Sequence, residues 1–184
     1  MSLTDVEGRL MTPSSAARDL QGLVRAASLA PSSHNTQPWL LRLCGWSIEL
    51  LADRTRALPV NDPLDRELTI SCGCALLNLR IAAAAAGLQA HVEVLADEAE
   101  GDLLARVRLA RSPAPLSDAE FASAIAERRT CRERFAATAV DAQTLRPLVE
   151  AAASEGATLT VLERSDQRLG AAALVAEGDA VLWA

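Results

Sequence analysis

The feature that most constrains this fold is a long segment, residues 62–87, whose centre is apolar almost all round. Asp62-Pro63 before it is a typical helix start, and Gly87 after it is a typical left-handed helix stop. A helix whose middle, Ile70 to Ala86, is apolar on nearly every side belongs in a core or at a subunit-like interface. The sequence therefore predicts a protein organised around one long, largely buried helix.

Two pairs of extended segments flank this helix along the chain. Leu40–Leu43 and Trp46–Leu51 favour strands, and Cys44-Gly45 between them predicts a tight turn. Leu88–Leu95 and Leu103–Arg111 alternate with period two around the acidic turn 96–102, which predicts a second antiparallel pair. Two hairpins and a central long helix indicate an α+β fold with an antiparallel-rich sheet.

Two further helices are expected around this framework. Thr12-Pro13 is a plausible N-cap and first turn for a helix that Pro31 ends, with apolar residues at helical spacing at Leu20, Leu23, Val24 and Ala27. Ser117 with Glu120 predicts a capping box for another helix, one that ends near an arginine cluster at 128–132.

Composition excludes some classes of function. The chain has 184 residues, is 50% hydrophobic, and carries a net charge of −6, which argues against binding nucleic acid through its phosphates. All 18 basic residues are arginine, so only their positions carry information. The longest apolar run, Ile81–Leu88, is far shorter than the roughly 20 residues that span a bilayer. Four cysteines without a secretory leader predict a cytoplasmic protein with no transmembrane segment.

A weak internal repeat is visible in the second half of the chain. Residues 145–153 echo residues 19–27, sharing Leu-Val-x-Ala-Ala, and each helix leads through a loop to an extended segment, at 40–43 and 158–162. We expect residues 1–115 to form a first repeat and 116–184 the start of a second, degenerate one. The second repeat is expected to be incomplete, with no equivalent of the loop at 31–38 and no later long helix.

The string Ala-Pro-Ser-Ser-His-Asn-Thr-Gln-Pro-Trp, residues 30–39, is the strongest functional signal. Directly after a helix, it places hydroxyls, carboxamides and backbone amides, and we expect these amides to be unpaired. Pro31 and Pro38 restrict the conformation of the segment. Without the full string, an ordinary polar loop would be an adequate explanation. His34 within it is at least as readily explained as a satisfied loop histidine.

The arginine cluster is the second functional signal. Guanidinium groups bind phosphate oxygens in a bidentate fork and stay charged, so Arg128, Arg129 and Arg132 with the Thr130 hydroxyl predict a phosphate clamp. On composition alone, a solvated helix terminus whose cations favour the helix dipole is the simpler explanation.

With residues 73–83 and Gly87-Leu88, these two motifs resemble the nitroreductase family, specifically the Acg-type tandem-repeat nitroreductases. The resemblance implies a nitroreductase-like α+β fold, bound flavin mononucleotide (FMN), NADH or NADPH as electron donor, and a nitro-compound or quinone as acceptor. It also implies one composite flavin site, with the loop from the first repeat and the arginines from the second. No catalytic acid or base is assigned, and no metal. The implied cofactor-binding residues are Pro31, Ser32, Ser33, Asn35, Gln37, Arg128, Arg129, Thr130 and Arg132.

The resemblance also implies a homodimer or pseudo-dimer, in which Leu79, Ile81 and the following alanines are exposed for a partner. Two other functions stay open. One is a non-catalytic flavin-binding or flavin-storing stress protein with an occluded or incomplete substrate site. The other is a metal protein, with ligands drawn from Cys72, Cys74, Cys131, His34 and His91. Because Cys72 and Cys74 point to different faces of a helix, buried structural thiols are the better account of that pair.

Overall fold

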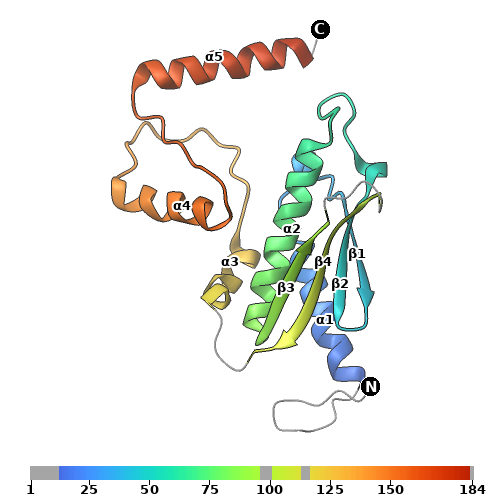
Figure 1. Ribbon diagram of the computed structural model, residues 1–184. Coiled ribbons are helices and arrows are strands. Elements are labelled where there is room, and N and C mark those ends of the chain that lie inside the picture. Colours follow the sequence, from blue (N-terminus) through green and yellow to red (C-terminus); the bar gives the residue numbers. More distant parts are fainter. Residues whose placement is uncertain (1–12, 96–100, 113–116, 183–184) are drawn as a thin grey trace. The chain divides into compact units, whose positions relative to one another are not determined.

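The computed structural model describes residues 13–95, 101–112 and 117–182. The chain divides into two compact units, Met1–Thr130 and Cys131–Ala184 (Figure 1). The repeat boundary expected at 115/116 falls at residues outside the described ranges. Whether the units correspond to the two expected repeats stays a prediction.

A four-stranded antiparallel sheet is the centre of the first unit. Its strands are β1 (Trp39–Cys44), β2 (Ser47–Ala52), β3 (Leu88–Val94) and β4 (Leu103–Arg111). The spatial order is β1-β2-β4-β3, so both predicted hairpins are confirmed and β2 pairs with β4 to join them. Gly45 has φ +62°, a left-handed conformation that suits glycine in the β1–β2 turn. The predicted α+β class is correct.

Two helices supply the core that covers one face of this sheet. They are α1 (Pro13–Ala27) and α2 (Arg66–Ala85) (Figure 1). Leu23 of α1 and Leu79 of α2 are buried with Ile48 and Val107 of the sheet in one apolar cluster. The Asn78 side chain also donates to the Ala26 carbonyl at 3.1 Å, which ties α2 to α1. The central helix is therefore packed within its own unit.

Both ends of α2 follow from local chemistry. The Asp62 carboxylate accepts hydrogen bonds from the Arg66 amide at 2.8 Å and the Leu68 amide at 2.9 Å, in the first turn. The Asp62 side chain thus satisfies amides of the first turn, although the N-cap residue is Asp65 and the helix begins at Arg66, three residues later than Pro63. Gly87 has φ +69° just after the last turn, as the stop signal predicted.

Helix α2 is long and apolar enough to cross a membrane by length and composition, the one such helix among the described residues. In its most apolar window 44% of the residues are buried inside the protein. Cys72, Ala75 and Ala83 of this helix lie in the core clusters beneath the sheet. Packing in the core accounts for its apolar composition.

One prediction about α2 is wrong. Leu79 is 0% exposed and Ile81 is 9% exposed, so neither side chain is available to a partner. Of the alanines that follow, Ala83 and Ala84 are buried, whereas Ala85 and Ala86 are exposed, and the helix also exposes Ile70, at 65%. The prediction was wrong because a helix that is apolar on every side gives no pattern that identifies the side packed against its own sheet.

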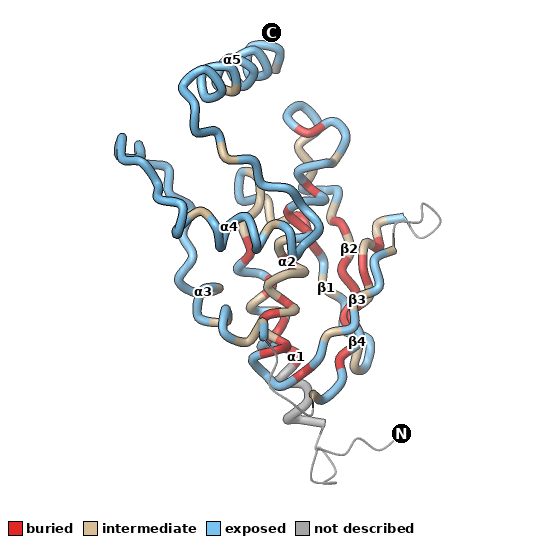
Figure 2. Tube along the Cα trace, turned by 60° about the vertical axis from the view of Figure 1, so that its left-hand side comes forward, coloured by how far each residue is buried: buried red, intermediate tan, exposed pale blue. Residues whose placement is uncertain are grey.

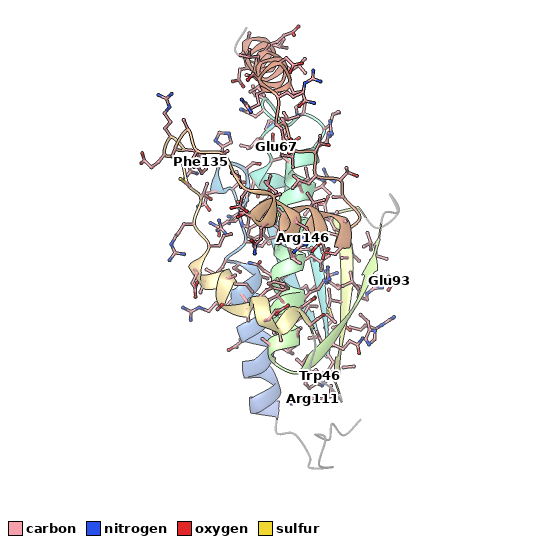
Figure 3. The ribbon with its side chains drawn as sticks, turned by 90° about the vertical axis from the view of Figure 1, so that its left-hand side faces the viewer. Trp46, Glu67, Glu93, Arg111, Phe135 and Arg146 are labelled. Carbon is pink, nitrogen blue, oxygen red and sulfur yellow. The ribbon has the colours of Figure 1, made fainter. Side chains whose placement is uncertain are left out.

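The opposite face of the sheet carries charges in register. Arg42 on β1, Glu49 on β2, Arg106 on β4 and Glu93 on β3 are successive cross-strand partners. Glu49 lies in the middle of this row, with Ile48 and Leu50 beside it pointing into the core. Figure 3 labels Glu93 on β3 at the edge of the sheet. A row of charged side chains thus crosses the face that α1 and α2 leave open.

The described residues of the first unit also form three short 3₁₀ helices and one more α-helix. They are η1 (Ser33–Asn35), η2 (Arg54–Arg56), η4 (Ser117–Phe121) and α3 (Ala122–Glu127). The capping box expected at Ser117 and Glu120 is wrong, because these residues form η4 and the residue before α3 is Phe121, with no side-chain cap. The helix does end beside the arginine cluster, as predicted.

The second unit contains α4 (Ala142–Ser154) and α5 (Ser165–Leu182). Asp141 caps α4 by accepting from the Thr144 amide at 2.8 Å. The expectation of no later long helix is wrong, since α5 has 18 residues. Residues 158–162, expected to be extended, pair with no strand. Among the described residues of this unit whose side chains are placed, none is buried (Figure 2), and Phe135 is 80% exposed (Figure 3).

Candidate functional site

The loop between α1 and β1, residues 31–38, is the most unusual backbone of the first unit. His34, Asn35 and Gln37 have φ of 50°, 57° and 50°, in the left-handed region that residues other than glycine seldom adopt. Each such residue costs on the order of 1–3 kcal/mol and persists only where the surroundings impose it. Asparagine tolerates this conformation better than histidine or glutamine. Strain of this kind gathered in one polar loop is typical of a ligand-binding segment.

Hydrogen bonds inside the loop hold its shape. The Ser32 hydroxyl oxygen accepts from the Gln37 amide at 2.9 Å, and the Thr36 hydroxyl donates to the Ser33 carbonyl at 3.0 Å. The Asn35 and Thr36 amides donate to the Ser32 and Ser33 carbonyls, each at 3.0 Å. Ser32 therefore has a structural task, while its own O–H is still able to donate.

The unpaired amides expected in this loop are largely absent. The amides of Asn35, Thr36 and Gln37 are bonded within the loop, and the Ser33 amide donates to the Ser71 hydroxyl of α2 at 3.3 Å. Side chains, rather than these amides, are what the loop offers to a ligand. Within the described part of the chain the exposed side chains of His34 and Asn35 have no hydrogen-bond partner.

Two prolines fix the ends of the loop, as the sequence indicated. Pro31 follows the last residues after α1, and Pro38 is buried beside Trp39 at the start of β1. The Cys72 thiol of α2 donates to the Pro38 carbonyl at 3.2 Å, and the Asp53 amide donates to the same carbonyl at 3.0 Å. The exit of the loop is therefore anchored to both the helix and the sheet.

Arg128 lies close to the entrance of the loop. Its guanidinium donates to the Leu29 carbonyl at 3.3 Å and to the Thr130 hydroxyl at 3.3 Å. Burial raises the pKa of the Cys74 thiol on α2, and the positive charge of Arg128 nearby partly opposes that rise. Arg128 and Thr130 are thus brought together, with the end of α1 and with α2, inside one unit.

The other two arginines are placed differently. Arg129 donates to the Ala126 carbonyl at 2.6 Å and to the Arg128 carbonyl at 2.8 Å, so it satisfies the C-terminal end of α3. That contact matches the simpler explanation, a helix terminus stabilised by its cations. Arg132 belongs to the second unit. Its part in a phosphate clamp therefore stays a prediction.

A groove of about 540 Å³ lies between α1, α2 and α3. Its lining is mostly small and apolar, including Gly22, Ala26, Ala82 and Ile125, and none of the proposed cofactor-binding residues belongs to it. The groove offers few hydrogen-bond donors and acceptors to a polar ligand. The loop, and not this groove, is the candidate site.

Metal binding has no geometric support in the part of the chain that the structure describes. No group of three histidine, cysteine, aspartate or glutamate side chains there is placed to hold a metal ion. All four cysteines are free thiols. Cys72 is fully buried, and burial raises the pKa of its thiol to about 11, which suits a neutral hydrogen-bond donor to Pro38.

Sequence reasoning missed two residues that support the loop: Ser71 and Arg56. Ser71 on α2 accepts from the Ser33 amide at 3.3 Å. Arg56 donates to the Thr36 carbonyl at 3.2 Å from beyond the end of β2. Their sequence positions, 20 to 38 residues from their partners, carry no local signal of the contact.

The described residues thus form an α+β protein whose most strained polar loop lies between its first helix and its first strand. No family model matches the chain. It is 33% identical over 151 residues to a candidate NAD(P)H nitroreductase of Mycobacterium tuberculosis (strain H37Rv), a match covering 82% of this chain and 44% of the relative. The matched part of the chain belongs to the nitroreductase family.

Two further similar proteins are also named as nitroreductases. The chain is 39% identical over 74 residues to the candidate NAD(P)H nitroreductase Acg of the same species, covering 40% of this chain and 22% of the relative. The solved nitroreductase CinD of Lactococcus lactis, in complex with 4-nitrophenol, aligns with a TM-score of 0.46 and 16% identity, over 67% of this chain and 89% of CinD. The chain spans less than half the length of the curated relatives that it matches.

Proposed function

We propose that this chain binds FMN through the loop 31–38 and the arginines near Arg128, and serves the reduction of a nitro-compound or quinone by NADH or NADPH. The observation that carries the proposal is the loop itself. It is polar, strained at three residues, and carries exposed side chains that have no hydrogen-bond partner among the described residues. The family membership supports the same cofactor.

The residues present fit the chemistry of FMN. Asn35 and Gln37 carry carboxamides, which both donate and accept hydrogen bonds, as the pyrimidine edge of a flavin requires. The Ser32 and Ser33 hydroxyls suit the ribityl chain. Arg128, whose partners in the protein are neutral oxygens, keeps a charge that a phosphate dianion would neutralise. We therefore assign binding roles to Pro31, Ser32, Ser33, Asn35, Gln37, Arg128, Arg129, Thr130 and Arg132.

The reaction needs little acid or base chemistry from the protein. The loop 31–38 and Arg128 would hold FMN, which would supply the hydride- and electron-transfer chemistry. The protein's part is to hold the flavin and to supply donors toward its pyrimidine edge. We accordingly propose no catalytic acid or base and no resident metal. We also propose a cytoplasmic homodimer or pseudo-dimer.

Absorption spectroscopy of the purified chain tests this proposal. Added FMN should bind with a shifted visible spectrum, and NADH or NADPH should then bleach the bound flavin. Bleaching followed by reoxidation with a nitro-compound or quinone would support the oxidoreductase. Binding without bleaching by either nicotinamide would favour the non-catalytic flavin-binding protein. No binding of FMN by the folded chain would contradict both.

A further inference from the structure

The strained conformation of the loop needs an external restraint. Three residues within four positions, His34, Asn35 and Gln37, have positive φ. The hydrogen bonds through Ser32 close the turn. Because both partners of each bond lie inside the loop, these bonds do not fix the position of the loop in the unit. Contacts from outside the loop are what fix it relative to the rest of the unit.

The first external contact comes from α2. Ser71 is 3% exposed, and its hydroxyl donates to the Glu67 carbonyl of its own helix at 2.7 Å. Figure 3 labels Glu67 near the start of α2. With its proton committed to the helix, the Ser71 oxygen acts as an acceptor and takes the Ser33 amide at 3.3 Å. A buried serine therefore fixes the first residue of the turn against the central helix.

The second external contact comes from the segment after β2. Arg56 donates to the Thr36 carbonyl at 3.2 Å and, through Nε, to Asp53 at 3.1 Å. Asp53 is itself held, because its carboxylate accepts from the Thr55 amide at 3.1 Å and its amide donates to the Pro38 carbonyl at 3.0 Å. Arg56 thus connects the last part of the turn to an anchored aspartate.

We propose that Ser71 and Arg56 are positioning residues of the candidate site. They hold the turn from its two ends, on α2 and on the segment after β2, and keep His34, Asn35 and Gln37 in their left-handed conformation. In doing so they set how tightly the loop binds flavin, a consequence that rests on the proposed function. Neither residue needs to contact the flavin for this role.

The test uses the full chain with two variants and two matched controls. Ser71→Ala removes the acceptor for the Ser33 amide. Its control, Thr69→Ala, removes the hydrogen bond from the Thr69 hydroxyl to the Asp65 carbonyl, which does not reach the loop. Arg56→Met removes both donors but keeps the aliphatic stem. Arg54→Met removes a neighbouring arginine that binds Asp65 and Asp102 instead.

Two readouts are measured on all five proteins. Amide hydrogen exchange of the apoprotein reports on the Asn35 and Gln37 amides, whose partners lie inside the loop. Titration with FMN gives the dissociation constant. Ser71→Ala and Arg56→Met should each speed exchange at these amides by about tenfold and weaken FMN binding by about threefold to tenfold, while the controls change neither.

Restoring variants separate positioning from general destabilisation. Ser71→Thr keeps the oxygen and should return exchange and affinity toward those of the unaltered chain. Arg56→Lys keeps one charged donor but not the forked guanidinium, so it should restore the exchange rate and the FMN affinity only in part. Equal exchange in Ser71→Ala and Thr69→Ala, together with equal exchange in Arg56→Met and Arg54→Met, would overturn the assignment.

The two readouts also keep this inference distinct from the proposed function. If the unaltered chain binds no FMN, the proposed function fails, and with it the effect on flavin affinity, while exchange still decides whether these residues hold the loop. If FMN binds the variants and the unaltered chain equally, the proposed function stands and the inferred effect of Ser71 and Arg56 on flavin affinity is wrong.

Discussion

Glu49 on β2 accepts a hydrogen bond from Arg42 on β1, with 2.7 Å between Oε2 and Nε. Arg106 on β4 donates to the other carboxylate oxygen at 3.2 Å, so one glutamate joins three strands. The thiol of Cys44 also donates to this carboxylate, at 3.6 Å. The carboxylate lies between two cations on the open face of the sheet, where water otherwise weakens single ion pairs.

This relationship predicts an acid-sensitive sheet. The hydrogen bond from Arg42 is the main reason that the pKa of Glu49 lies below its ordinary value. A group with a lowered pKa stabilises the fold above its unfolded pKa, about 4.3, and this contribution is lost as pH falls through the lower folded pKa. Glu49→Gln should therefore lower the free energy of unfolding at pH 7 and flatten its decline below pH 5. Urea unfolding at several pH values would show this, and an unchanged slope would contradict it.

The cap on α2 predicts a stability change away from the site. Asp62→Ala leaves the Arg66 and Leu68 amides without their acceptor and should cost about 1 kcal/mol of unfolding free energy, within a range of 0.5–2. Asp62→Asn keeps a side-chain acceptor and should lose less. Denaturant unfolding of both variants measures the difference. Equal stability of Asp62→Ala and the unaltered chain would rule out this capping role.

The phosphate clamp predicts a difference between two flavins. Arg128→Gln and Arg132→Gln, made singly, should each weaken FMN binding by about tenfold to a hundredfold, because each removes a charge-assisted bond to the phosphate. Riboflavin lacks the phosphate, so its affinity should not change. Arg146→Gln, which changes an exposed arginine near Glu150, is the control. Equal losses for FMN and riboflavin would mean that the arginines act on the fold and not on the phosphate.

The exposed carboxamide of Asn35 predicts a change in the bound flavin. Asn35→Leu replaces a donor and acceptor with an apolar group, so FMN binding should weaken by about tenfold and the bound spectrum should shift. Asn35→Gly is the informative partner variant, since glycine tolerates φ 57° without the side chain. If the two variants bind FMN as tightly as the unaltered chain and give its spectrum, Asn35 has no contact with the flavin.

The thiols predict unequal reactivity. Cys72 is buried and burial raises its pKa to about 11, so about one molecule in a thousand carries the thiolate at pH 8. Cys44 and Cys131 are exposed. Iodoacetamide at pH 8 should alkylate Cys44 and Cys131 in the folded protein and Cys72 only after unfolding, as mass spectrometry of the peptides would show. Rapid alkylation of Cys72 in the folded chain would be inconsistent with this packing.

Local patterns in the sequence determined the elements of the first unit. Period-two alternation placed β3 and β4, and a preference for extended structure around the Cys44-Gly45 turn placed β1 and β2. The start and stop signals at Asp62 and Gly87 placed α2, because all these signals depend on neighbours a few residues away. The loop at 31–38 and the end of α3 near Arg128 were found in the same way. The second unit was predicted less well, since α5 was not expected.

Tertiary structure alone decided how these elements meet. The pairing of β2 with β4 joined the two hairpins, and the packing of α1 and α2 on that sheet decided that Leu79 and Ile81 are buried rather than exposed. It also brought Ser71, Arg56 and Arg128 to the two ends of the loop. Such contacts join residues 20 to about 100 positions apart. Because the partner is so distant in the sequence, the residues next to a side chain carry no signal of the contact. The residue types of the loop could be interpreted from the sequence. The contacts that restrain its shape could be identified only from the tertiary structure.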